Sequence, residues 1–79
     1  MNIEIYSKKN CIFCDKAKII LQKYNPKILI LDEDYNREDF FSKFPNARTF
    51  PQIIINEEHV GGYAELKRWL DQNSFDENF

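Results

Sequence analysis

The sequence predicts an α/β fold: one four-stranded mixed sheet flanked by helices, in the order β-α-β-α-β-β-α. Two observations carry this prediction. Short apolar runs rich in β-branched residues alternate along the chain with segments whose apolar residues recur at helical spacing. Prolines and a glycine pair separate several of these segments. The 79 residues suffice for one domain, which we expect to span residues 1–79 with a frayed tail at 73–79.

The first segment predicts a strand over residues 2–6, because Ile3 and Ile5 alternate with polar neighbours. A helix is expected from Cys11 to about Tyr24. Asn25-Pro26 ends it, since a residue that precedes proline avoids helical angles. The apolar residues that share one face of this helix are Phe13, Ala17, Ile20, Leu21 and Tyr24.

The middle of the chain predicts a second strand and a second helix. Ile28–Leu31 is an unbroken apolar run, typical of a strand that is covered on both faces. Because a helix joins it to the first strand, the two strands should be parallel. Asn36 is placed to cap the second helix, with Asp39 in a capping-box position. The side chains expected to face the core from this helix are Phe40, Phe41 and Phe44.

The last third of the chain predicts a hairpin and a final helix. Residues 52–56 are rich in isoleucine and form the expected third strand. After a tight turn, His59-Val60 would pair antiparallel with that strand. Gly61-Gly62 permits unusual backbone angles before a helix that begins at Tyr63. The inner face of that helix would carry Leu66, Trp69 and Leu70.

Composition and charge exclude several classes of function. The net charge is −2 and no long block has one sign, so we expect no nucleic-acid partner. No apolar run approaches the roughly 20 residues of a membrane span, and the first residues do not read as a signal peptide. One close cysteine pair without a wider cysteine framework fits a reducing compartment. We therefore expect a cytoplasmic protein without a membrane association.

The chemistry-bearing motif is Cys11-Ile12-Phe13-Cys14, which contains both cysteines of the chain. A thiol at a helix N-terminus meets unpaired N–H groups and the positive end of the helix dipole, and both lower its pKa. The second thiol lies within reach on the same turn. The pair therefore indicates reversible thiol–disulfide exchange, with a pair of small buried apolar residues as the alternative. A zinc site within one chain is disfavoured, because only His59 remains as a further ligand.

With these motifs in place, the chain resembles a small dithiol glutaredoxin of the thioredoxin-fold superfamily. The resemblance covers nearly the whole chain, and the pieces that carry it are Ile5–Lys8, Cys11–Cys14, Thr49–Gln52 and Val60–Tyr63. It implies a thioredoxin-like fold and a glutathione-dependent thiol-disulfide oxidoreductase. It also implies a monomer that uses glutathione as reducing co-substrate and holds no tightly bound cofactor and no metal.

The resemblance also implies roles for single residues. Cys11 would be the nucleophile and Cys14 the more buried resolving thiol, with Pro51 in the cis form opposite them. The residues implied to contact glutathione are Lys8, Phe13, Thr49, Phe50, Pro51, Gly62, Tyr63, Ala64 and Glu65. Gln52 and Arg48 are weaker candidates for the ligand carboxylate that Lys8 would bind. His59 is expected to be a surface strand residue.

The sequence departs from the family pattern at three places. Ile12-Phe13 replaces the commonest Pro-Tyr between the cysteines, and Phe50 replaces the usual Val before the turn proline. After the glycine pair, Ala64 and Glu65 stand where many members carry Ser or Thr and then Asp. The last change removes a hydroxyl and lengthens an acid in the expected glutathione site.

The resemblance implies that the partners are glutathione and oxidised or glutathionylated proteins, with ribonucleotide reductase as the expected client. Two alternatives stay open. The first is a glutaredoxin-like donor that is reduced by thioredoxin reductase instead of glutathione. The second is a dimerising module that binds an iron–sulfur cluster with help from glutathione.

Overall fold

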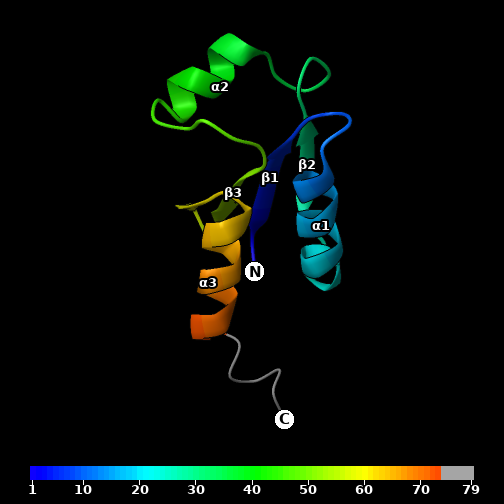
Figure 1. Ribbon diagram of the computed structural model, residues 1–79, viewed down its shortest axis with the longest axis vertical. Helices are drawn as coiled ribbons and strands as arrows, with labels where there is room; N and C mark the ends of the chain where they lie inside the picture. The colour runs from blue at the N-terminus through cyan, green and yellow to red at the C-terminus, as the bar shows by residue number, and fades with distance from the viewer. Residues whose placement is uncertain (74–79) are drawn as a thin grey trace.

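The computed structural model describes residues 1–73 and contains, within them, four strands and three α-helices in the predicted order (Figure 1). A short 3₁₀ turn, Gln22–Tyr24, continues the first helix. Asn73, placed in the predicted tail, is the last residue of the third helix, and residues 74–79 lie outside the described part. The elements are β1 (Ile3–Ser7), α1 (Ile12–Leu21), β2 (Lys27–Ile30), α2 (Arg37–Lys43), β3 (Gln52–Ile55), β4 (Glu58–Gly61) and α3 (Tyr63–Asn73).

The four strands form one mixed sheet in the order β2-β1-β3-β4. β1 pairs parallel with β2 and antiparallel with β3, and β3 pairs antiparallel with β4. Ile5 lies at the centre of the sheet, opposite Ile28 on one side and Ile53 on the other. The predicted mixed sheet, the parallel pair and the antiparallel hairpin are therefore confirmed.

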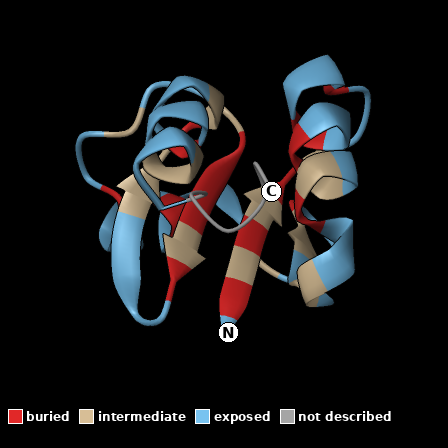
Figure 2. Cartoon of the chain, turned by 90° about the horizontal axis from the view of Figure 1, so that it is seen from below, coloured by how far each residue is buried: buried red, intermediate tan, exposed pale blue. Residues whose placement is uncertain are grey.

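One face of the sheet carries the aliphatic core. Buried and half-buried residues alternate along β1, which Figure 2 shows as red and tan bands on the strand that starts at the N-terminus. The buried side chains of the sheet face α1 and α3, and the apolar residues of these two helices complete the core cluster. Each fully buried aliphatic side chain of this kind stabilises the fold by roughly 1.5–3 kcal/mol. The cluster consists of Ile3, Ile5, Ala17, Leu21, Ile53, Ile55 and Leu66.

The other face carries an aromatic cluster that fastens α2, which lies beyond one end of the sheet in Figure 1. Tyr6, on the face of β1 opposite Ile5, meets the ring of Phe44 at 5.1 Å between centroids. Phe40 on α2 and Phe44, which caps the C-terminus of that helix, are buried as predicted, but Phe41 is exposed, so that part of the prediction was wrong. The helix has only seven residues and presents one side to the sheet, and Phe41 lies about 100° away from Phe40.

The prediction that Ile28–Leu31 is covered on both faces was also wrong. β2 is an edge strand, and Ile28 retains 40% of its exposure. α1 packs chiefly on β1, an inner strand of the sheet. An unbroken apolar run in this chain therefore marks an edge strand whose outer apolar positions are open.

The caps of the helices follow the sequence closely. Asn36 Oδ1 accepts from the Asp39 N–H at 2.8 Å, and Asp39 Oδ2 accepts from the Asn36 N–H at 3.4 Å, so the predicted capping box is confirmed. The turn after α1 ends at Asn25 in the left-handed conformation (φ 57°) directly before Pro26. None of the helices within residues 1–73 combines the length and apolar character that a membrane span requires.

Candidate active site

Cys11 is the N-cap residue of α1, as the sequence predicts. Its backbone is extended (φ −126°, ψ 106°), and its Sγ accepts from the Cys14 N–H at 3.2 Å. Its carbonyl oxygen accepts from the Asp15 N–H at 3.1 Å, the first bond of the helix. The two cysteines form a disulfide, with Cys11 9% exposed and Cys14 fully buried. The outer sulfur is therefore the one that occupies the electropositive end of the helix.

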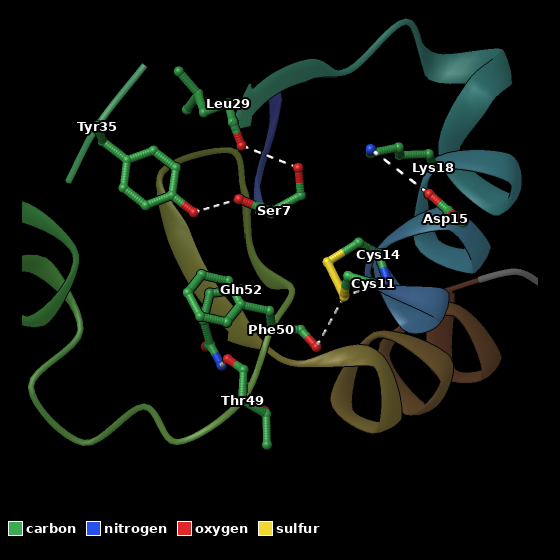
Figure 3. Close-up of a disulfide and its surroundings, with 10 residues drawn as sticks. All are labelled: Ser7, Cys11, Cys14, Asp15, Lys18, Leu29, Tyr35, Thr49, Phe50 and Gln52. Atoms are coloured by element: carbon green, nitrogen blue, oxygen red, sulfur yellow. Dashed lines mark hydrogen bonds and ion pairs between the residues drawn. A yellow bond between two sulfur atoms is a disulfide. The ribbon is translucent and has the colours of Figure 1, made fainter. Parts of the chain in front are cut away.

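The Phe50-Pro51 turn faces this disulfide. The Phe50-Pro51 peptide bond is cis, as the resemblance implies. The Phe50 carbonyl oxygen lies 3.8 Å from Cys11 Sγ (Figure 3). A disulfide sulfur carries no hydrogen, so this is a close contact and not a hydrogen bond. A group that becomes bonded to Cys11 Sγ would start beside the backbone of Phe50.

A cleft of about 330 Å³ opens next to this turn. It brings together residues from α1, from the loop before β3 and from the start of α3, and two of its aromatic rings, Phe13 and Tyr63, lie 5.4 Å apart. Seven of the residues implied to contact glutathione line it: Phe13, Thr49, Phe50, Gly62, Tyr63, Ala64 and Glu65.

Phe13 does not belong to the core-facing side of α1, which corrects the predicted helical face. It is 52% exposed, whereas Cys14, Ala17 and Leu21 are the buried residues of α1. One residue step turns a helix by about 100°, so a buried Cys14 rotates Phe13 out of the core. The side chain is thereby placed on the wall of the cleft.

The other two residues of the predicted set, Lys8 and Pro51, do not line this cleft. The Lys8 ammonium lies 5.7 Å from the centre of the Phe50 ring, and the residue lines a separate hollow with Lys9. Lys9, in turn, forms an ion pair with Glu33 at 3.0 Å. Pro51 is buried, and its carbonyl oxygen would lie 3.4 Å from a Cβ on Gly62. Lys8 therefore approaches the site across the Phe50 ring, while Pro51 supports the wall of the cleft from behind.

The side chain of Glu65 folds back and caps the N-terminus of its own helix, α3. Its Oε1 accepts from the Gly62 N–H at 2.8 Å, and its Oε2 accepts from Arg68 Nη2 at 3.2 Å. The fold-back needs small residues at the turn. A Cβ on Gly61 (φ 122°) would lie 2.8 Å from Glu65 Cγ. The carboxylate thus occupies one N–H group of a helix end that faces the cleft.

Gln52 and His59 form a pair that the sequence reasoning missed. Gln52 is buried, with its amide bonded to the Thr49 carbonyl and to the His59 ring. Its amide is therefore committed within the protein, against its proposed role as a ligand for a carboxylate. The signal in the sequence was a polar residue at the start of an otherwise apolar strand, with a histidine on the strand that returns beside it.

Tyr35 reinforces the start of the loop that leads to Cys11. Its hydroxyl donates to the Ser7 carbonyl oxygen at 2.6 Å, at the end of β1. Burial, with a smaller contribution from the neighbouring Tyr6, raises the pKa of Tyr35 to about 12. Burial, followed by Glu4, also raises the pKa of Tyr6. Both phenols are therefore neutral at physiological pH.

Within residues 1–73, no group of three or more His, Cys, Asp or Glu residues is arranged to hold a metal ion. The chemistry that the site offers is carried by its sulfurs. The site combines three features that thiol–disulfide exchange requires. These are a disulfide, a helix N-terminus that stabilises negative charge on the outer sulfur, and an adjacent cleft.

Known proteins are similar to this chain in sequence and in fold. The family model of glutaredoxin matches residues 3–60. Glutaredoxin 3 of Escherichia coli is 35% identical over 68 residues, which cover 82% of this chain and 81% of that protein. The crystal structure of glutaredoxin 1 from Francisella tularensis, complexed with cacodylate, superimposes with a TM-score of 0.75 at 30% identity, covering 90% and 93% of the two chains. A buckwheat glutaredoxin–glutathione complex shares the fold, with a TM-score of 0.76 at 18% identity over 90% of this chain and 69% of that one.

Proposed function

This chain belongs to the glutaredoxin family of thiol-disulfide oxidoreductases, and from that membership we propose that it reduces protein disulfides and glutathione mixed disulfides with glutathione as electron donor. The observation that carries the proposal is the position of Cys11 Sγ. It accepts the Cys14 N–H at the start of α1 and lies 3.8 Å from the Phe50 carbonyl beside the cleft.

The proposed reaction begins with the reduced dithiol. The Cys11 thiolate, stabilised by the helix end, attacks one sulfur of the substrate disulfide. A bond forms between Cys11 and that sulfur, the substrate S–S bond breaks, and the leaving thiolate takes up a proton. The Cys14 thiolate then attacks Cys11 Sγ, forms the disulfide seen in the structure and releases the second substrate thiol.

Two molecules of glutathione restore the dithiol. The thiolate of the first attacks Cys11 Sγ, which forms a mixed disulfide and releases Cys14 as a thiol. The thiolate of the second attacks the glutathione sulfur of that mixed disulfide, which frees Cys11 and yields glutathione disulfide. Two electrons pass from two glutathione molecules to one substrate disulfide, so the cycle balances. Potentials of glutaredoxins lie near −200 to −230 mV, which suits this donor.

The cleft supports glutathione as the donor. It has aromatic walls, the Phe50 backbone beside the sulfur, and the N-terminus of α3, where N–H groups favour a carboxylate. The buckwheat glutaredoxin, of the same fold, has been solved with glutathione bound. Lys8, across the Phe50 ring, is the proposed partner of the second ligand carboxylate.

The proposed clients are oxidised or glutathionylated proteins, oxidised ribonucleotide reductase among them. We place the reaction in the cytoplasm, since a single close cysteine pair fits a reducing compartment. We assign it to the monomer, as the resemblance to small dithiol glutaredoxins implies.

One observation favours a second candidate, in which thioredoxin reductase supplies the electrons. Glu65 already occupies the Gly62 N–H and places a negative charge on the lining of the cleft. Both effects weaken the binding of an anionic tripeptide while leaving the disulfide accessible to a protein reductase.

The test is turnover of a small disulfide by the purified chain with glutathione, glutathione reductase and NADPH, in parallel with thioredoxin reductase and NADPH. NADPH oxidation that depends on the chain in the first mixture supports glutathione as the donor. Oxidation in the second mixture alone would transfer the proposal to thioredoxin reductase. A Cys11→Ser variant serves as the control, because it retains the cleft and loses the attacking sulfur.

A further inference from the structure

Gln52 is a buried polar side chain beside the active site that takes no part in the proposed sulfur chemistry. It is 5% exposed and follows Pro51 directly. Its Nε2 donates to the Thr49 carbonyl oxygen at 2.9 Å, so the side chain bridges the Phe50-Pro51 turn (Figure 3). Its Oε1 lies 2.7 Å from His59 Nε2 on β4. A glutamine this deeply buried is stable only when its amide is paired, and both ends of this amide are.

The pattern of donors and acceptors determines that Nε2 of the His59 ring carries a hydrogen. The Thr49 carbonyl can only accept, so the amide nitrogen of Gln52 must face it. The amide oxygen then faces His59 and can also only accept. His59 Nε2 must therefore carry a hydrogen, and it keeps that hydrogen in both the neutral and the cationic ring.

A second route of contacts leads from His59 back to the same turn. The His59 ring packs on Phe44 at 4.5 Å between centroids, and Phe44 lies 5.3 Å from Phe40. Phe40 stacks on Phe50, again at 4.5 Å. The side chain of Phe50 is thus held from α2, while the backbone before it is held through Gln52. Both routes start at His59; one ends at Phe50, whose carbonyl faces Cys11 Sγ, and the other at Thr49, the residue directly before it.

We propose that Gln52 and His59 are positioning residues for the exchange reaction: they hold the Thr49–Pro51 backbone in the orientation that presents Phe50 to a substrate bonded to Cys11. The inference rests on the proposed exchange at Cys11 but not on the identity of the reductant. Its physical basis is that a displacement of about 1 Å at a reacting centre can cost up to roughly 10²-fold in rate. Substrates with a peptide backbone, which can pair with Phe50, should depend on the pair, and substrates without one should not.

The experiment compares two substrates in single turnover with the reduced full chain and no glutathione. One is the symmetric disulfide of a short cysteine-containing peptide, and the other is bis(2-hydroxyethyl) disulfide, which has no backbone. In each case the Cys11 thiolate attacks one sulfur of the substrate disulfide and forms a new S–S bond with it. The substrate S–S bond breaks, and its other sulfur leaves as a thiolate that solvent protonates.

The decisive variant is His59→Phe, which keeps an aromatic ring against Phe44 and removes the donor to Gln52. We expect it to slow the reaction with the peptide disulfide roughly 10-fold and to change that with bis(2-hydroxyethyl) disulfide by less than about twofold. His59→Gln, which retains a side-chain N–H donor, should recover most of the loss. Glu58→Gln, at an exposed neighbour on β4, is the matched control and should match the unmodified chain. Gln52→Leu should reproduce the effect of His59→Phe.

Three results would overturn the proposal. The first is equal rates of His59→Phe and the unmodified chain with the peptide disulfide. The second is an equal loss with both substrates, which would indicate a general structural role. The third is a nitrogen-15 spectrum which shows that the single ring hydrogen of neutral His59 lies on Nδ1 and not on Nε2. Because His59 is exposed, its variants should fold even if Gln52→Leu does not, and thermal unfolding of each variant verifies this.

Discussion

The N-termini of α1 and α3 both border the candidate site, yet they are closed by different atoms. The helices are of similar length, 10 and 11 residues, so their dipoles are comparable. At α1 the acceptor is a sulfur: Cys11 Sγ takes the Cys14 N–H. At α3 the acceptor is a carboxylate: Glu65 Oε1 takes the Gly62 N–H.

The comparison shows that a helix N-terminus supplies a positive electrostatic field, and that the atom placed in this field decides whether the end reacts or only binds. A sulfur in that field is stabilised as a thiolate and can exchange its covalent partner. A carboxylate in the same field is stabilised but chemically inert, and it occupies a donor that an incoming anion could use. Chemistry is therefore expected at α1 and recognition at α3, and the following predictions test that division.

The largest effect is expected when the sulfur is removed from the α1 end. Cys11→Ser should lower disulfide exchange by a factor on the order of 10³ or more, because the hydroxyl is not ionised at neutral pH and forms no disulfide. Mass spectrometry of Cys14→Ser with a glutathionylated peptide should show a stable adduct at Cys11. A stable adduct at Cys14 in Cys11→Ser would reverse the two roles.

The next effect should come from Gly61→Ala at the α3 end. Gly61 has φ 122°, and an added Cβ would lie 2.8 Å from Glu65 Cγ, so the cap and the turn cannot both persist. The free energy of unfolding should fall by about 1–3 kcal/mol, measured by urea denaturation. Alkylation of Cys11 by iodoacetamide should keep its rate under native conditions. A matching loss of Cys11 reactivity would show that the two helix ends are not separable.

The N-terminus of α2 lies away from the candidate site and therefore serves as the reference for the effect of a lost helix cap alone. Asn36→Ala removes the capping box and should cost about 1 kcal/mol in unfolding free energy. Exchange activity should stay within about twofold of the unmodified chain, since this cap contacts neither sulfur nor cleft. Activity that fell with stability here would indicate that any weakened helix end, not a particular one, impairs the site.

A smaller effect is expected for Glu65→Gln, which retains an acceptor for the Gly62 N–H and removes the charge. The KM for glutathione should fall about two- to fivefold at low ionic strength, because a negative charge no longer faces an anionic ligand. The difference should shrink at high salt. A rise in KM would mean instead that Glu65 binds the ammonium group of the ligand.

The smallest effect on stability at neutral pH is expected for a change at Tyr35, which lies at the N-terminus of neither α1 nor α3. Its pKa in the folded chain is raised to about 12 from 10.0, so the folded state keeps the proton while the unfolded chain loses it. The contribution of Tyr35 to stability should be constant with pH below about 10 and decline from there through about 12. Tyr35→Phe should flatten this decline in thermal unfolding measured across that range, and an unchanged alkaline decline would assign it to other groups. Ser7 keeps a donor in the variant, since its carbonyl oxygen also accepts from the Leu31 N–H.

The sequence by itself determined the order of the elements, the capping box at Asn36 and the placement of Cys11 at the start of a helix. These features depend on neighbours two to four residues apart, and such spacings are visible in a linear chain. The same holds for the cleft residues Thr49 and Gly62, which short motifs identified and the structure brings together.

Only the tertiary structure decided which apolar residues would be covered and which polar ones would be paired. Ile28 is open because its strand lies at the edge of the sheet, and Phe13 faces the cleft because Cys14 takes the buried side of its helix. The pairing of Gln52 with His59 requires two strands to meet. The contact of Phe50 with Cys11 joins residues 39 positions apart. Such contacts depend on the relative placement of whole elements, and burial, pairing and access to the sulfur are properties of that placement.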